Sequence, residues 1–314
     1  VLLVGVTFAL FYLANGINGG FGAIFQTMGE GKFLAADQPI FNPNILKDSV
    51  FLLIVGAGLN TCSSYVSSQD IVQRFTTTTD MKKLNKMMLT NGALSIFIAT
   101  VFYLIGTGLY VFYSQNALPP AAQQDQIFAS YIAYELPVGI TGLLLAAIYA
   151  ASQSTLSTGL NSVATSWTLD IQERLSKKEM SFALQTKIAQ YVSLGVGIVA
   201  ILVSMVLANG EIKSAYEWFN GFMGLVLGVL GGTFALGTFT KVANAKGAYV
   251  AFFVAAVTMV CIKYMAPAGS VSIWSYSIIS IAISLVVGIP VSMITRKMDG
   301  DTSKPVKDAT IYHN

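Results

Sequence analysis

Charged residues are scarce in this chain, and that scarcity sets the class of protein. Only 11% of the 314 residues are charged, whereas 54% are hydrophobic and the mean hydropathy is +0.65. A soluble domain carries about 25% charged residues, because its surface must face water. The net charge of +3 is too small to indicate a polyanionic partner. The composition therefore predicts an integral membrane protein and excludes a soluble enzyme or a nucleic-acid-binding domain.

Histidine and cysteine are also nearly absent. The one histidine, His313, is the penultimate residue, which excludes a histidine-based catalytic triad or zinc site inside the chain. Cys62 and Cys261 lie in separate apolar segments, so they form neither a disulfide framework nor a thiolate metal site. No charged residue lies at the centre of an apolar run, which argues against a proton relay of buried carboxylates. No nucleophile and base are paired at depth, so we expect no enzymatic activity and no cofactor.

Long apolar runs dominate what is present. A helix needs roughly 20 apolar residues to cross a bilayer, and the alternating pattern of barrel strands is missing here. The sequence predicts an all-α, polytopic helix bundle with about eight spans, near residues 1–17, 49–69, 88–113, 137–166, 187–208, 216–238, 246–266 and 273–295. These spans form one transmembrane domain, 1–298, followed by a polar tail, 299–314. Thr76–Thr79 followed by Asp80 predicts the N-cap of a short helix between two spans.

The basic residues between the spans support this count. Eight spans place fourteen Lys and Arg residues on one side of the membrane and four on the other. Because basic residues accumulate in cytoplasmic loops, we expect the 14-residue side and the C-terminus to be cytoplasmic. The chain opens inside an apolar run with no initiator Met and no charged segment before it. We therefore expect a piece of a longer protein rather than a signal peptide.

Hydroxyl side chains crowd the span 137–166. Five of the seven residues 152–158 are Ser or Thr, and Ser154, Thr158, Asn161 and Thr165 share one helical face. Each hydroxyl can bond the carbonyl four residues back and still offer a lone pair. Such a set of neutral oxygens suits a hard monovalent cation such as Na⁺. The alternative is close packing of small residues against a neighbouring helix.

The span 49–69 holds the second polar cluster. Gly56, Gly58 and the polar run Asn60–Tyr65 interrupt an apolar segment near its middle. A glycine-interrupted span is a pointer to a broken helix at a transporter's central site. The alternative is a continuous helix whose polar stripe faces its neighbours. The residue pattern leaves both interpretations open.

At these residues the chain resembles the sodium/solute symporter family, which includes sodium-coupled glucose, proline, iodide, monocarboxylate and sialic acid transporters. The resemblance covers essentially the whole chain. It is carried by Ser68–Arg74, by Ala146–Ile148, by Ser154–Ser162 with Thr168–Asp170, and by Lys246–Ala248. It implies a LeuT-like, inverted-repeat fold from which the first helices of the family are missing. The spans from 49–69 to 216–238 would form the second repeat.

The resemblance also implies a sodium site. By position, Ala151 supplies a carbonyl oxygen, while Ser154 and Thr155 supply hydroxyls. Members similar to bacterial sialic acid transporters have a second sodium site, in which Ser154, Ser157 and Thr158 would take part. That site also needs an aspartate, and Val1–Gly29 contains no acidic residue. This partner would therefore lie upstream of Val1.

For the solute, the resemblance places polar contacts at Thr61, Ser64 and Asn220. Ser64 stands where the family has an aromatic gate, with Tyr65 next to it. The resemblance implies sodium-coupled symport across the plasma membrane, leaning toward a sugar or sialic acid. The alternatives are an amino-acid or monocarboxylate symporter, a membrane sensor of the same fold, and a passive channel. Neither the oligomeric state nor the identity of the solute follows from the sequence.

Overall fold

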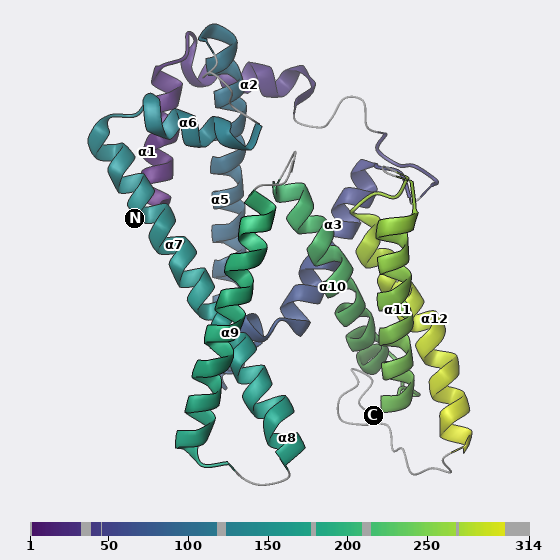
Figure 1. Ribbon diagram of the computed structural model, residues 1–314. Helices are drawn as coiled ribbons and strands as arrows, with labels where there is room; N and C mark the ends of the chain where they lie inside the picture. The colour runs from purple at the N-terminus through teal and green to yellow at the C-terminus, as the bar shows by residue number, and fades with distance from the viewer. Residues whose placement is uncertain are drawn as a thin grey trace. The chain divides into compact units, whose positions relative to one another are not determined.

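The computed structural model describes residues 2–32, 39–44, 46–117, 124–176, 180–208, 215–267 and 270–298. Every regular element within these ranges is a helix, which confirms the all-α class (Figure 1). Among the described residues, seven helices are long and apolar enough to span a membrane. An eighth span results if α1 (Leu2–Asn15) and α2 (Gly20–Thr27), which meet at 96°, are taken together. The predicted tail, 299–314, lies outside the described residues.

Most helix bounds lie within a few residues of the predicted spans. The closest agreement is in α3 (Val50–Ser67), α7 (Val138–Thr165), α10 (Ala215–Phe239), α11 (Ala245–Met265) and α12 (Ser275–Met298). Two helices begin earlier than predicted, namely α5 (Met81–Gln115) and α9 (Phe182–Ala208), and α7 continues as a π-helix to Gln172. Apolar length therefore locates the spans, whereas their extensions beyond the bilayer follow from local capping and turns.

The start of α5 corrects one prediction. Asp80 is an N-cap as expected, since its carboxylate accepts a hydrogen bond from the Lys82 N–H at 2.9 Å. The helix that it caps is not a short separate one, however, but runs unbroken for 35 residues to Gln115. Nothing between Met81 and the apolar span stops the helix, because the intervening Lys, Leu and Met residues are good helix formers.

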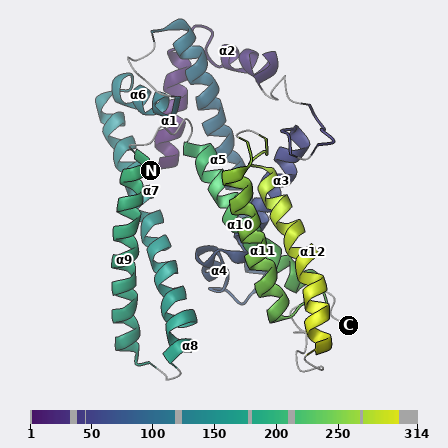
Figure 2. The ribbon, with the colours of Figure 1, turned by 45° about the vertical axis from the view of Figure 1, so that its right-hand side comes forward.

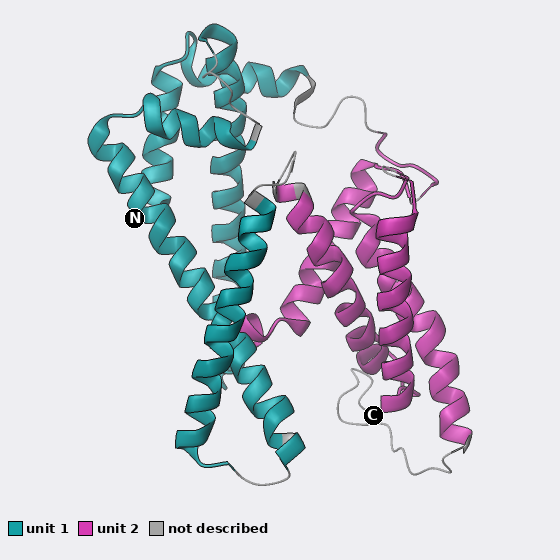
Figure 3. Ribbon diagram, viewed as in Figure 1, with its two compact units in different colours: residues 1–33, 73–214 teal, residues 34–72, 215–314 magenta. Residues whose placement is uncertain are grey.

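The chain divides into two compact units (Figure 3). The first comprises residues 1–33 and 73–214 and contains α1, α2, α5, α7, α9 and the short α6 (Ile127–Tyr134) and α8 (Glu173–Ser176). Its core joins α1, α2, α5, α6 and α7 through residues such as Leu13, Ile24, Ile105, Tyr131 and Leu144. Helix α9 runs beside α7 (Figures 1 and 2), and none of the residues in its predicted span is buried.

A glycine turn connects α1 to α2. Gly19 and Gly20 have φ angles of +96° and +55°, a left-handed conformation that side chains with a Cβ rarely adopt. The turn lets Ile24 of α2 pack into the core of the first unit, where it is fully buried. The stretch between the first two predicted spans thus begins with a short helix.

The second unit comprises residues 34–72 and 215–314 and contains α3, α10, α11 and α12. Glycines of α10 and α11 meet serines of α12 closely. A Cβ atom built at Gly228, Gly232 or Gly247 would overlap Ser280, Ser284 or Ser292, respectively. All three serines are fully buried. Small residues let helix backbones approach in a membrane, and they hold this unit together.

Helix α3 is continuous through Gly56 and Gly58, so the structure favours the second of the two interpretations of this span. Gly56 is small for a packing reason, because a Cβ atom there would overlap the Trp274 carbonyl group. The helix instead breaks at Ser68, which is extended at φ −79° and ψ 120° before α4 (Gln69–Phe75) begins. The break therefore lies at the end of the span rather than near its middle.

Candidate functional site

The predicted sodium ligands all lie on α7 of the first unit. The Thr155 hydroxyl donates to the Ala151 carbonyl at 3.0 Å, and the Thr158 hydroxyl donates to the Ser154 carbonyl at 3.0 Å. These are the back-bonds expected of hydroxyls in a membrane helix, and they point hydroxyl lone pairs away from the helix axis. The helix therefore presents both hydroxyl and carbonyl oxygens along one stretch of its surface.

Four of these residues share one face. At 100° per residue, Ala151, Ser154, Thr155 and Thr158 fall within about 100° of each other, while Ser157 lies about 60° beyond Ser154. Ser154, Thr155 and Ser157 are exposed, and Ala151 and Thr158 are half-buried. The face is therefore partly covered at Ala151 and Thr158 and open at Ser154, Thr155 and Ser157. A polar stripe halfway along an apolar span is costly to leave in lipid, so it indicates a surface that contacts protein or water.

The chemistry of the face is that of neutral oxygen ligands. Across the described parts of the chain, no three His, Cys, Asp or Glu side chains gather into a group that could hold a metal ion. Hydroxyl and carbonyl oxygens without a carboxylate bind divalent ions poorly, since Ca²⁺ and Mg²⁺ sites rely on carboxylates. What α7 offers is a set of neutral hydroxyl and carbonyl oxygens.

The predicted solute contacts lie in the second unit. Thr61 and Ser64 are three residues apart on α3 and therefore share a face. The Ser64 hydroxyl lies 3.3 Å from the Ser68 hydroxyl, which extends the polar face to the helix break. Thr61 is exposed, and Ser64 is half-buried. The structure therefore brings these two residues together on one polar stripe.

Asn220 is not part of that stripe. Its amide donates to the Tyr216 carbonyl at 2.9 Å within α10. Gly231 of α10 packs on Ser63 of α3, whereas Gly221 lies beside Ile273. Asn220 precedes Gly231 by eleven residues and Thr61 precedes Ser63 by two, so the rise of a helix places Asn220 roughly 13 Å from Thr61 along the helix direction. A single small group cannot contact both.

The structure also draws attention to Asn60, which the sequence did not single out as a site residue. Its side-chain oxygen is buried and has no hydrogen-bond partner among the described residues. A buried amide oxygen without a partner is uncommon and costs free energy. The only signal in the sequence was an amide at mid-span, beside Thr61.

Comparisons with known proteins give this arrangement a family. A family model described as the sodium:solute symporter family matches residues 1–255. The sodium/sialic acid symporter SiaT of Proteus mirabilis is 33% identical over 251 residues, which cover 79% of this chain and 50% of that protein. The sodium/sialic acid symporter NanT of Aliivibrio fischeri is 29% identical over 275 residues, covering 87% of this chain and 53% of that protein.

A solved structure agrees with these relatives. It is described as the substrate-bound outward-open state of a Na⁺-coupled sialic acid symporter and matches with a TM-score of 0.81 at 28% identity. The match covers 93% of this chain and 60% of that one. The chain spans about half the length of the curated relatives that it matches. Fold, helix order and sequence agree, and the chain belongs to the sodium:solute symporter family.

Proposed function

We propose that this protein couples the downhill entry of Na⁺ to the uptake of a small organic solute, with a sugar acid such as sialic acid as the favoured substrate. The observation that carries the proposal is the uncovered oxygen face of α7, at Ser154 and Thr155. The names of the two sialic acid symporter relatives support the choice of solute. Both the ion and the solute are transported species and not resident cofactors.

For the ion, the Ala151 carbonyl and the hydroxyls of Ser154 and Thr155 form one side of a sodium site. Ser157 and Thr158, with Ser154, form part of a second site one turn along the helix. The Thr155 proton is held by the Ala151 carbonyl, so the oxygen of Thr155 presents a lone pair to the ion. Losing one such ligand costs roughly 1–3 kcal/mol, which is about 5- to 150-fold in sodium affinity.

Coupling follows from the neutrality of these ligands. At the first site, whose proposed ligands are all neutral, bound Na⁺ keeps its full charge, and the membrane potential adds about 2.3 kcal/mol per charge per 100 mV. The ion drives transport only if it binds one conformation of the protein more tightly than the other. We propose that Na⁺ favours the outward-open state and that its loss to a low-sodium cytoplasm opens the inner path.

For the solute, Thr61 and Ser64 form the direct contacts on α3. Asn220 belongs to another part of the same path, because it lies roughly 13 Å away along the helix direction.

The protein is a polytopic membrane protein, and we place it in the plasma membrane with its C-terminus in the cytoplasm. That it is a polytopic membrane protein follows from its family and from the seven apolar helices among the described residues. The orientation is supported by the distribution of Lys and Arg, with fourteen on the proposed cytoplasmic side and four on the other.

The test is uptake by the protein expressed from its complete reading frame and reconstituted into liposomes. Labelled sialic acid, glucose and proline are supplied with an inward Na⁺ gradient or an equal K⁺ gradient. We expect saturable, sodium-stimulated uptake of sialic acid. Uptake of another solute with the same sodium dependence would retain symport and refute the sugar acid. Uptake that neither saturates nor responds to Na⁺ would refute symport.

A further inference from the structure

The C-terminal part of α7 is polar on one side only. At 100° per residue, the polar residues between Leu156 and Thr165 fall within an arc of about 140°, and the non-polar residues of this stretch fill the opposite side. The polar set is Ser157, Thr158, Asn161, Ser162 and Thr165. Such a division inside an apolar span indicates that the polar side meets water or polar partners and the other side meets lipid or apolar neighbours.

Two members of the polar side extend the face of the sodium ligands. Asn161 and Thr165 are not predicted ligands, yet they lie within about 60° of Ser154 and Thr158 around the helix. The four residues follow one another at about 6, 4.5 and 6 Å along the helix axis. Oxygen ligands bind Ca²⁺, a cation of similar size to Na⁺, at about 2.3–2.6 Å. An ion between two successive members of this row can therefore contact both of them.

The side chains of Asn161 and Thr165 retain their bonding capacity. Asn161 is exposed and Thr165 is half-buried, and neither side chain has a hydrogen-bond partner within the part of the chain that the structure describes. Ser162, next to Asn161, is different, because it is buried and its hydroxyl donates to the Thr158 carbonyl at 2.9 Å. Polar groups in a protein normally find a partner in protein, water or ligand. Asn161 and Thr165 are thus available to water or to a passing ion.

The row is also electrically neutral. No Asp, Glu, Lys or Arg occurs between Val138 and Leu169. Neutral oxygens hold a monovalent cation less tightly than carboxylates do. Passage of an ion requires several sites that bind it well enough to admit it and weakly enough to let it go. A row of amide and hydroxyl groups spaced along about 16 Å of helix meets that requirement.

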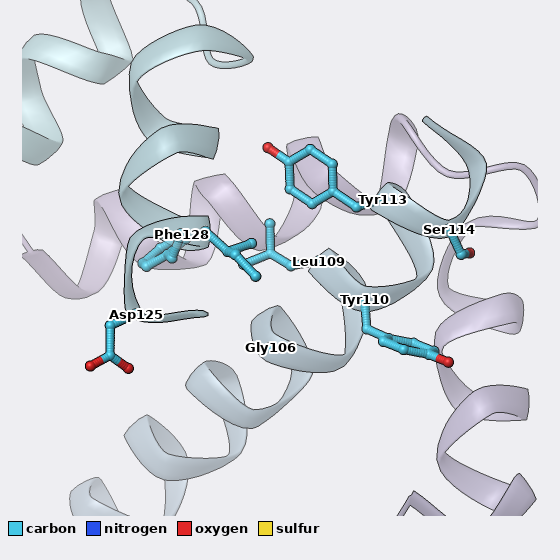
Figure 4. Close-up of a pocket in the computed structure, with 8 residues that line it drawn as sticks. Gly106, Leu109, Tyr110, Tyr113, Ser114, Asp125 and Phe128 are labelled. Carbon is cyan, nitrogen blue, oxygen red and sulfur yellow. The ribbon is translucent and has the colours of Figure 1, made fainter. Parts of the chain in front are cut away.

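A separate cavity of the first unit contributes nothing to this row. It has a volume of about 570 Å³ and lies beside Tyr113, between the last third of α5 and the start of α6 (Figure 4). Its lining is mainly apolar and aromatic, and the Asp125 carboxylate points away from the Tyr113 hydroxyl. None of its lining residues belongs to α7. The polar row therefore lies on the surface of α7 and not in this cavity.

We propose that the row Ser154, Thr158, Asn161 and Thr165 is the route by which Na⁺ leaves its site toward the cytoplasm. The amide oxygen of Asn161 and the hydroxyl of Thr165 replace part of the hydration of the ion as it passes. This inference rests on the proposed sodium site and on the proposed orientation of the chain. It assigns Asn161 and Thr165 to ion release, whereas the proposed ligands serve ion binding.

Water access along α7 tests the route without measuring transport. Asn161→Cys and Thr165→Cys are made in the intact protein after its exposed cysteines, Cys62 and Cys261, are replaced by Ala. Val163→Cys is the matched control, because Val163 is exposed at the same level on the opposite side of the helix. The impermeant cation 2-(trimethylammonium)ethyl methanethiosulfonate is supplied on either side of liposomes in K⁺ without Na⁺, and labelling is followed by mass spectrometry.

Because such reagents attack the hydrated thiolate, the rate of labelling reports water access. From the cytoplasmic side, we expect the Asn161→Cys and Thr165→Cys variants to react at least about tenfold faster than the Val163→Cys variant. Equal rates in all three variants, no reaction at either polar position, or reaction from the outer side alone would each overturn the route.

Asn161→Leu separates release from binding. We expect equilibrium binding of labelled Na⁺ to stay within about twofold of wild type, and the maximal rate of solute uptake to fall about fivefold or more, because the lost contact is made only during release. Gln190→Leu, which removes an exposed amide from α9, is the control. An unchanged rate, or a loss of Na⁺ affinity as large as the loss of rate, would contradict a role in release.

The two experiments also distinguish this inference from the proposed function. Absence of Na⁺ binding in the wild-type protein would refute the proposed function itself. Na⁺ binding and sodium-driven uptake without the expected pattern of cysteine labelling would refute only the route along α7.

Discussion

Two glycines of α3 give opposite predictions for the same substitution. Gly56 and Gly58 are two residues apart in one helix, yet a Cβ atom at Gly56 would overlap the Trp274 carbonyl, whereas one at Gly58 would meet no heavy atom within 4 Å. The obstacle at Gly56 is backbone and cannot rotate away. Replacing Gly56 by Ala therefore forces α3 and the start of α12 apart.

The magnitude follows from a comparison of the two variants. Both gain about 1 kcal/mol of helix propensity when Gly becomes Ala. Overpacking costs typically 1–3 kcal/mol, and it applies only at Gly56. We therefore expect Gly58→Ala to be neutral or stabilised by up to about 1 kcal/mol, and Gly56→Ala to be less stable than Gly58→Ala by about 1–3 kcal/mol.

The assay is thermal unfolding of the purified protein in detergent, followed by tryptophan fluorescence. At about 2–4 °C per kcal/mol for a chain of this size, the midpoints of the two variants should differ by several degrees. Equal midpoints would refute the close contact with Trp274. A loss of stability in both variants would instead support a helix broken at Gly56 and Gly58, because both glycines would then be needed for their backbone conformation.

Two further predictions concern the ends of helices. Asn244→Ala should lower stability by about 1–2 kcal/mol in the same assay, because the side chain caps α11 through the Gly247 N–H and also donates to the Ser292 carbonyl and the Thr295 hydroxyl. Asn244→Asp should recover only the cap, and full recovery would contradict the role of the donated bonds. Burial chiefly, and then the nearby Tyr12 and Glu135, raises the pKa of Tyr131 above its ordinary 10. Unfolding therefore releases a proton above pH 10, so stability should fall as the pH rises further, and Tyr131→Phe should flatten that fall. An unchanged slope in unfolding titrations would count against the buried phenol.

The sequence predicted the spans well because the bilayer imposes a simple rule. Apolar length alone located α3, α7, α10, α11 and α12 to within a few residues. The N-cap predicted at Asp80 is also present in the structure, where its carboxylate accepts a hydrogen bond from the Lys82 N–H. The length of α5 did not follow from hydropathy, because its first turns are polar. They are helical all the same, but a search for apolar runs does not detect them.

The glycines of α3 show where sequence reasoning stops. Gly56 and Gly58 look alike in the sequence, but only the neighbouring Trp274 carbonyl distinguishes close packing from a break. That contact joins residues more than two hundred positions apart and leaves no local signal. The same holds for Asn220, whose distance from Thr61 depends on how α10 packs against α3.

For the candidate site, local spacing was sufficient for α7 and insufficient elsewhere. The back-bonds of Thr155 and Thr158 follow from helical periodicity, and the structure contains them. The assignment of these oxygens to sodium remains a prediction. The cavity beside Tyr113 had no signal in the sequence, because it forms between the end of one helix and the start of another.

The most direct test of the sodium site is the Na⁺ dependence of solute uptake in variants of Thr155. Thr155→Val removes the hydroxyl and keeps the shape, whereas Thr155→Ser keeps the hydroxyl. Thr186→Val on α9 is the control, since Thr186 makes the same back-bond, to Phe182, on another helix. We predict that half-maximal uptake requires about fivefold or more Na⁺ in Thr155→Val and close to the wild-type concentration in the other two. An unchanged Na⁺ requirement in Thr155→Val, with uptake intact, would contradict a sodium site on α7.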